Sequence, residues 1–161
     1  MVSPRSAAPD TVIESRRGEF LISTDPARLN FDVIYGFLTN CYWSKGIPRE
    51  VVARSIEHSL CFGVYDGSGA QVGFARVVSD FATVAYLGDV FILESHRGCG
   101  LSKSLMESIT QHPALQGLRR WILLTRDAHG LYKKFGFTPV KAPDRYMERH
   151  DPSVYEIRKT T

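Results

Sequence analysis

The sequence predicts a single α/β (α+β) domain with a mixed, mostly antiparallel central sheet and helices on both faces. The first supporting observation is a series of strand-like runs at 60–65, 70–79 and 83–93, joined by short turns as in an antiparallel meander. The second is the recurrence of apolar residues at helical spacing on either side of these runs. The third is a continuous apolar run at 121–125, typical of a strand covered on both faces.

Glycine and proline residues mark the boundaries between the expected elements. Gly67 and Gly69 supply the positive φ angles that a tight hairpin needs, Pro48 suits the start of a helix, and Gly136 suits its end. In chain order we expect a strand at 18–24, helices at 29–38 and 48–59, strands at 60–65, 70–79 and 83–93, a helix beginning at Leu101, a strand at 121–125, a helix at 128–135, and last strands at 137–140 and 154–157.

Length and composition fit one folded domain. The chain has 161 residues, of which 43% are hydrophobic and 23% are charged, so it can bury a core and is not typical of a disordered protein. Residues 1–17 are rich in Ser, Pro, Ala and Arg without an apolar period. We therefore expect a mobile leader over 1–17 and a single domain over 18–161.

Charge and cysteine content exclude several classes of function. The net charge of +3 comes without a basic run, which argues against a nucleic acid partner. Apolar stretches are shorter than the roughly 20 residues that cross a bilayer, and the amino terminus has no apolar core, so we expect no membrane partner and a cytoplasmic location. Cys41, Cys61 and Cys99 lack metal-ligand or disulfide spacing, so we expect reduced thiols and no metal site.

The segment Arg97-Gly98-Cys99-Gly100-Leu101-Ser102 carries the clearest chemical signal. It lies between an expected buried strand and an amphipathic helix, so successive backbone N–H groups can face outward at the helix start and bind an anion. The partial positive charge of the helix end and the Arg97 guanidinium favour a diphosphate. The alternative is a purely structural one, a tight strand-to-helix turn that binds no ligand.

Two known phosphate-binding motifs do not fit this segment. A nucleotide-hydrolase P-loop needs Gly-Lys-Ser/Thr, but Leu101 follows Gly100 here. The dinucleotide-binding pattern G-x-G-x-x-G fails because Lys103 stands where the third glycine is required. Magnesium-dependent phosphoryl transfer and dinucleotide chemistry are therefore disfavoured.

The chain resembles the GNAT superfamily of acetyltransferases in two stretches. The family signature Q/R-x-x-G-x-G/A is met by Arg97 and Gly100, with Ser102 at the last position. The segment TRDAHGLYKKFGF at 125–137 resembles the family pattern N-x-x-A-x-x-L-Y-x-x-x-G-F, with Thr125 in place of the common asparagine. Both stretches occur in the family's order, and the expected elements match the family's over nearly all of 18–157.

The resemblance implies an acetyl-CoA site. Backbone amides would hold the diphosphate along the segment of Arg97, Gly98, Cys99, Gly100, Leu101, Ser102 and Lys103. The pantetheine arm would pair, like an added strand, with exposed backbone at Val90, Phe91 and Ile92. The Ile92 N–H would then stabilise the oxyanion.

The resemblance also suggests how protons move. Tyr132 matches the family tyrosine near the sulfur, so it would contact the cofactor and protonate the leaving thiolate, although it also fits an apolar helical stripe. Asp89 is our preferred base, with Glu94 and His129 as alternatives. Asp89 could equally serve as a structural partner of an arginine.

The acceptor side is expected in the loop between the first two helices. Tyr42 and Trp43 lie in this loop and Arg76 on the neighbouring hairpin, and the adjacent aromatic residues would either wall a pocket or fill the core. The predicted activity is N-acetyl transfer from acetyl-CoA to a primary amine by direct attack in a ternary complex, on a small-molecule or protein acceptor. The alternative is an acyl-CoA-binding sensor without turnover. An exposed final strand could also pair two chains into a homodimer.

Overall fold

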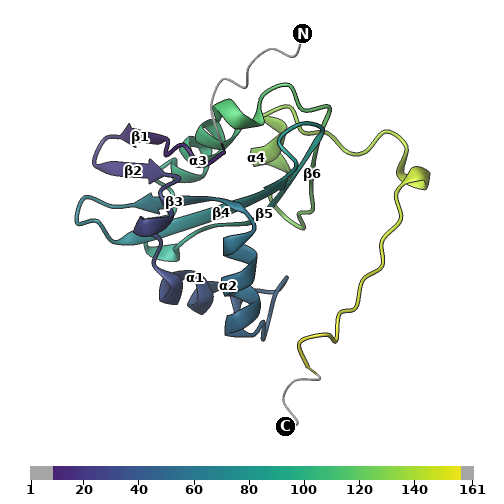
Figure 1. Cartoon of the computed structure of the whole chain (residues 1–161), viewed down its shortest axis with the longest axis horizontal. Coiled ribbons are helices and arrows are strands. Elements are labelled where there is room, and N and C mark those ends of the chain that lie inside the picture. Colours follow the sequence, from purple (N-terminus) through teal and green to yellow (C-terminus); the bar gives the residue numbers. More distant parts are fainter. Residues whose placement is uncertain (1–8, 157–161) are drawn as a thin grey trace.

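The central element of the protein is a six-stranded sheet in the order β1-β2-β3-β4-β5-β6 (Figure 1). The computed structural model describes residues 9–156. The strands are β1 (Glu14–Arg17), β2 (Phe20–Ser23), β3 (Leu60–Tyr65), β4 (Gln71–Ser79), β5 (Val84–Ile92) and β6 (Arg120–Leu123). Neighbours from β1 to β5 are antiparallel, and β6 is parallel to β5. The mixed, mostly antiparallel sheet expected from the sequence is confirmed.

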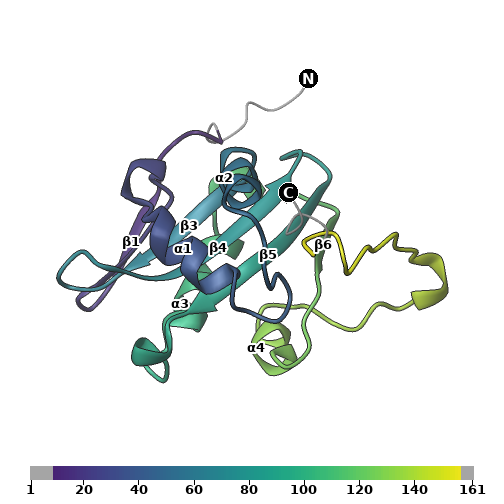
Figure 2. The same cartoon turned by 90° about the horizontal axis from the view of Figure 1, so that it is seen from below.

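Helices cover both faces of this sheet (Figures 1 and 2). Helices α1 (Phe31–Leu38) and α2 (Arg49–Glu57) lie on one face, and α3 (Leu101–Thr110) lies on the other with the short α4 (His129–Lys133). Each face has its own apolar cluster, because alternate side chains of a strand point to opposite sides. Short 3-10 turns occupy Pro26–Arg28, Glu94–His96, Pro113–Leu115 and Pro143–Arg145.

The helix boundaries follow from local chemistry. The Asn30 side chain accepts a hydrogen bond from the Val33 N–H at 3.2 Å and so caps α1. In α3, the apolar residues that the sequence places at helical spacing are all buried: Leu101, Leu105, Met106 and Ile109. Their burial fixes the start of α3 against the sheet, which positions the glycine turn that precedes it.

The amino-terminal segment differs from the sequence prediction at 14–17. These residues were expected in a mobile leader, but they form β1, an edge strand paired with β2 through a turn at Gly18, where φ is 59°. Polar contacts hold β1: the Ser15 hydroxyl lies 2.9 Å from that of Ser108, and Arg17 forms an ion pair with Glu107 of α3. A strand with no buried apolar face has no alternation by which sequence reasoning could find it. The residues before position 9 lie outside the described part of the chain.

The last two predicted strands are wrong within the described residues. Segment 137–140 forms no strand and pairs with none of the sheet, and 154–156 form a turn, while Ile157 lies outside the described residues. Both runs have strand-like composition, but a strand also needs a partner edge. The chain after Val140 instead leaves the body of the protein as an arm (Figure 1).

Three further features of the described residues concern membrane-spanning helices, metal ligands and the cysteines. Within residues 9–156, no helix is long and apolar enough to cross a bilayer. The described chain holds no group of three or more His, Cys, Asp or Glu side chains arranged to bind a metal ion. Cys41, Cys61 and Cys99 are free thiols, and burial raises the pKa of Cys61 to about 12.

A buried histidine makes stability depend on pH. His112 is 1% exposed, and its Nδ1 accepts a hydrogen bond from the Ala114 N–H at 3.2 Å, so this ring nitrogen carries no proton. Burial lowers the pKa of His112 below its ordinary 6.5. As pH falls, His112 therefore binds a proton in the unfolded chain at a higher pH than in the folded protein. The free energy of unfolding is highest above pH 6.5 and decreases as pH falls below that value.

We expect the melting temperature to fall by about 2–4 °C between pH 7 and pH 5.5 on account of His112. His112→Asn keeps an acceptor for the Ala114 N–H but does not titrate, so it should flatten this part of the profile even if it melts lower at every pH. Thermal unfolding followed by circular dichroism checks this. Equal pH slopes in the two proteins would contradict the assignment.

Candidate functional site

Strands β5 and β6 are paired over only the first half of β5. They pair from Val84 opposite Arg120 to Leu87 opposite Leu123, where β6 ends. From Gly88 to Ile92, β5 has a partner in β4 but none on the side of β6 among the described residues. One edge of this stretch is therefore open to accept hydrogen bonds from a ligand with an extended amide backbone.

The ladder shows which backbone groups face this opening. The Leu93 N–H donates to the Val72 carbonyl at 2.8 Å, so the backbone of Leu93 faces β4. Antiparallel alternation then turns the N–H and carbonyl of Ile92 toward the open side, and those of Phe91, which lies opposite Phe74, back toward β4. The sequence-based site grouped Val90, Phe91 and Ile92, but the Phe91 backbone is engaged in the sheet.

A β-bulge directs Asp89 toward the helices α1 and α2. Arg76 lies opposite Gly88 and Phe74 opposite Phe91, so β5 has one extra residue between these two pairs. The bulge inverts the alternation: Leu87 contributes to the α3-side core before it, and Ile92 does so after it. Asp89 has φ of 54°, a conformation that aspartate tolerates better than most residues with a side chain.

Both oxygens of the Asp89 carboxylate are held. Oδ2 accepts from Arg76 Nε at 2.5 Å, and Oδ1 accepts from Trp43 Nε1 at 3.0 Å. Arg76 also donates from Nη1 to the Ser59 hydroxyl at 3.3 Å. Asp89 thus joins β4, β5 and the loop after α1. The structural role that sequence reasoning left open is present, and each carboxylate oxygen keeps a further lone pair that can accept a proton.

Aromatic side chains form a wall beside Asp89. Phe37 stacks on Phe91 with ring centroids 3.9 Å apart, and Trp43 lies 6.0 Å from Phe37. Tyr42 meets Trp43 edge-on at 5.0 Å, and the guanidinium carbon of Arg126 lies 3.8 Å from the centre of the Tyr42 ring. Tyr42 and Trp43 remain 49% and 42% exposed, so they border open space and do not plug the core.

The glycine turn before α3 has the geometry of an anion site. Gly98 and Gly100 have φ angles of 82° and 75°, a left-handed region that favours glycine. A Cβ built on either would meet open space. Gly100 is the N-cap residue of α3, and no described side chain caps this helix end, so the first N–H groups of the helix lack a side-chain acceptor. Cys99, between the two glycines, is exposed.

The Arg97 backbone N–H, which the sequence assigned to the diphosphate, is already engaged, because it donates to the Glu94 carbonyl at 3.2 Å. The Arg97 side chain is anchored as well. Its Nε donates to the Ile92 carbonyl at 3.0 Å. The guanidinium is thus anchored at the open end of β5, and it links the stretch Gly88–Ile92 to the glycine turn. Its charge still lies at the junction of these two parts of the site.

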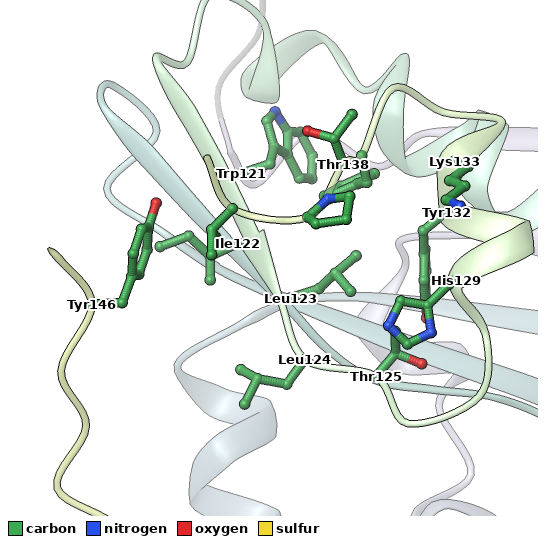
Figure 3. A pocket seen from close by; sticks show the side chains of 13 residues that line it. Trp121, Ile122, Leu123, Leu124, Thr125, His129, Tyr132, Lys133, Thr138 and Tyr146 are labelled. Atoms are coloured by element: carbon green, nitrogen blue, oxygen red, sulfur yellow. The ribbon is translucent and has the colours of Figure 1, made fainter. Parts of the chain in front are cut away.

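Tyr132 is buried at the other side of the opening, on α4 (Figure 3). Its side chain is 8% exposed, and its hydroxyl forms no hydrogen bond with another residue of the described chain. Burial is the main cause that raises the pKa of Tyr132 above its ordinary 10, and Tyr42 and Asp127 add to the rise. The phenol therefore stays protonated at neutral pH, ready to donate.

The other sequence-based candidates lie at the margins. Glu94 is exposed in the 3-10 turn after β5, and His129 is exposed at the first residue of α4. The Thr125 hydroxyl accepts from the Ala128 N–H at 3.0 Å, so threonine here fixes the approach to α4. Sequence reasoning missed Arg126. Its contact with Tyr42 joins two loops that are far apart in the chain, and no local sequence pattern indicates such a contact.

Taken together, the site has an anion-binding turn, an open strand edge, a buried phenol and a carboxylate in an aromatic wall. The turn suits the diphosphate of a nucleotide cofactor, and the open edge suits an extended arm that carries amides. The Ile92 N–H, facing the opening, can donate to a negative oxygen. A phenol and a carboxylate together can return and remove a proton.

Comparison with known proteins gives consistent matches. Residues 57–139 match the family model described as an acetyltransferase (GNAT) domain. A Gibberella zeae protein assigned as an acetyltransferase is 35% identical over 140 residues, 73% of this chain and 78% of that protein. A chloroplastic GCN5-related N-acetyltransferase of Arabidopsis thaliana is 29% identical over 147 residues, 88% of this chain and 71% of that one.

A solved structure agrees with this fold. A Xanthomonas campestris protein assigned to the GNAT family superposes with a TM-score of 0.82 at 52% identity, covering 84% of this chain and 96% of that one.

Proposed function

Because the chain belongs to the GNAT family of acetyltransferases, we propose that it transfers an acetyl group from acetyl-CoA to a primary amine. One observation carries this proposal: an uncapped helix start behind two left-handed glycines adjoins an open strand edge, with a buried phenol across the opening. Acetyl-CoA has the matching parts in the matching order, namely a diphosphate, an amide-bearing arm and a thioester.

The residues of the turn fit the cofactor. Backbone N–H groups from Gly98 to Lys103 would bind the diphosphate, because positive φ angles and the helix end turn several donors to one side. The open edge of β5 at Val90 and Ile92 would hold the amides of the arm. When bound, acetyl-CoA supplies an activated acyl group, and these residues orient it.

Proton transfer is assigned to two side chains. The acceptor nitrogen forms a bond to the acyl carbon, the bond from that carbon to sulfur breaks, and the Ile92 N–H stabilises the oxygen in between. Asp89 removes the proton that the nitrogen loses, directly or through water. Tyr132 donates its phenolic proton to the thiolate and regains one from solvent.

The acceptor would bind on the α1–α2 side of the opening. Trp43, Tyr42 and Phe91 supply apolar walls, and Arg126 adds positive charge beside Tyr42, whereas the charge of Arg76 is paired with Asp89. Such a surface fits an amine that also carries an aromatic or acidic group, on a small molecule or a protein.

An acceptor screen tests the activity. The full chain with acetyl-CoA is mixed with panels of amines and peptides, and release of free CoA thiol is followed with a thiol reagent. We expect release with at least one primary amine and a mass gain of one acetyl group on it. Stabilisation by CoA without thiol release across the panels would favour the sensor alternative instead.

Asp89→Asn tests Asp89 as the base; it can keep the contact with Trp43 but loses the ion pair with Arg76. Asparagine keeps an oxygen for the Trp43 N–H but cannot accept a proton at neutral pH, so kcat should fall about tenfold or more with the KM for acetyl-CoA unchanged. Glu94→Gln, at the exposed carboxylate beyond the same strand, should stay within about twofold. Steady-state kinetics decide: a rise in acceptor KM with unchanged kcat would show that Asp89 only positions Trp43 and Arg76.

A further inference from the structure

A contact between two loops joins the two sides of the opening between β5 and β6. The guanidinium carbon of Arg126, in the loop from β6 to α4, lies 3.8 Å from the centre of the Tyr42 ring, in the loop from α1 to α2. The first loop leads to the α4 side of the sheet and the second lies on the other side (Figures 1 and 2). Tyr42 also adds to the raised pKa of Tyr132, so the contact lies within electrostatic reach of the buried phenol.

The charge of Arg126 has no partner of opposite sign within residues 9–156. Its side chain is exposed, and it forms no ion pair or hydrogen bond with any of these residues, its neighbour Asp127 included. The Tyr42 ring contacts the face of the guanidinium, which leaves the N–H donors around its edge available. Arg76, by contrast, is paired with Asp89. Of these two arginines, Arg126 is the one that can bind an anionic group without losing an ion pair.

Two aromatic side chains lie between Arg126 and the carboxylate of Asp89. Asp89 accepts a hydrogen bond from Trp43 Nε1 at 3.0 Å. Trp43 meets Tyr42 edge-on, with ring centroids 5.0 Å apart, and the Tyr42 ring carries the guanidinium. An amine at Asp89 and an anionic group at Arg126 would therefore be held at opposite ends of this pair of rings. The arrangement favours an acceptor whose chain separates the two groups over an α-amino acid, which has both on one carbon.

We propose that the acceptor is a primary amine whose chain ends in a carboxylate, as in an ω-amino acid, and that Arg126 binds this carboxylate while Tyr42 positions the guanidinium. Because it names the acceptor of the same site, this proposal rests on the proposed acetyl transfer. A guanidinium can bind a carboxylate through two parallel charge-assisted hydrogen bonds, which a neutral carboxamide cannot match. The methylene groups between the two ends would lie against the exposed rings of Tyr42 and Trp43.

Binding measurements test the proposal without turnover. The full chain, saturated with CoA, is titrated calorimetrically with γ-aminobutyrate and ε-aminocaproate, and with the carboxamide of each, which has the same length but no negative charge. We expect at least one acid to bind about tenfold more tightly than its carboxamide, and Arg126→Gln to remove this preference by weakening the acid alone. No binding of either acid, equal affinities for acid and carboxamide, or an unchanged preference in the Arg126 variant would overturn the proposal.

Arg120→Gln is the matched control for Arg126→Gln. Arg120 is also exposed and also lies over a tyrosine ring, that of Tyr146 at 5.9 Å, but it stands at the end of β6 opposite the opening. This variant should keep the preference for the acid, and both variants should bind CoA as the parent does. Weaker CoA binding by Arg126→Gln alone would overturn the proposal, because it would assign Arg126 to the cofactor.

Two variants of Tyr42 test its positioning role. Tyr42→Leu removes the ring that holds the guanidinium and should lose most of the preference for the acid, and Tyr42→Phe, which restores a ring, should regain it. The same titrations measure both. An equal preference in the leucine and phenylalanine variants would remove Tyr42 from the assignment.

Thiol release distinguishes failure of this proposal from failure of the acetyl transfer itself. Release of CoA thiol at the same kcat/KM with an acid and with its carboxamide would leave the activity in place and overturn the role of Arg126. Binding of the acid through Arg126 without thiol release would support the anion site and count against acetyl transfer to that amine.

Discussion

Tyr132→Phe is expected to lower kcat by about 10²–10³-fold and to leave the affinity for CoA unchanged. The ring is buried and its hydroxyl forms no hydrogen bond with the rest of the described chain, so phenylalanine fits the same space without a loss of folding contacts. What the variant lacks is the proton donor for the leaving thiolate, and a positioned general acid contributes an effect of this size. Assays of thiol release measure kcat, and calorimetric titration with CoA measures the affinity for CoA.

The pH profile adds a second readout for Tyr132. Because burial raises the pKa of this phenol, the parent should keep its donor up to a pH above the ordinary 10. The variant has no such group, so any decline of the parent's rate that belongs to Tyr132 should be absent from its profile. Unchanged kcat in the variant would remove Tyr132 from the chemistry and leave it as part of the core.

Gly100→Val is expected to weaken CoA binding by about 10²-fold. Gly100 has φ of 75°, which a β-branched residue adopts only with strain. The backbone before α3 would therefore change conformation, and its N–H groups would no longer point at the ligand. Each charge-assisted hydrogen bond contributes roughly 1.5–3 kcal/mol, so the loss of one or two accounts for the predicted change. Calorimetric titration measures it.

Gly69→Val is the control for Gly100→Val. Gly69 has φ of 86° and open space around a built Cβ, as Gly100 does, but it lies in the hairpin between β3 and β4. Both variants should lose similar thermal stability, and only the one at Gly100 should lose CoA affinity. Equal loss of affinity in both would mean that backbone strain acts through the fold and that the turn before α3 is not the binding site.

The sequence predicted those parts of the protein that local chemistry determines. The helix at Leu101 and the hairpin around Gly69 follow from periodicity and from turn residues, and both were found, although only Gly69 has the positive φ angle that was expected of Gly67 as well. The glycine turn was also found where the sequence placed it, between a buried strand and an amphipathic helix, and the structure adds that Gly98 and Gly100 both have positive φ angles.

The remaining parts depend on contacts between distant segments. The bulge that aims Asp89 at Arg76 is set by the register of β5 against β4, which no single strand reveals. Strand β1 is held by polar contacts to Ser108 and Glu107, and the strand-like run at 137–140 has no partner in its own sheet. Composition gave the tendency of each segment, and tertiary pairing decided the outcome.

A crystal structure of the full chain with bound CoA tests the proposed function most directly. The proposal predicts that the diphosphate accepts hydrogen bonds from backbone N–H groups between Gly98 and Lys103, and that the sulfur lies beside the Tyr132 hydroxyl. A diphosphate bound away from this turn, or a sulfur on the far side of β5 from Tyr132, would contradict it.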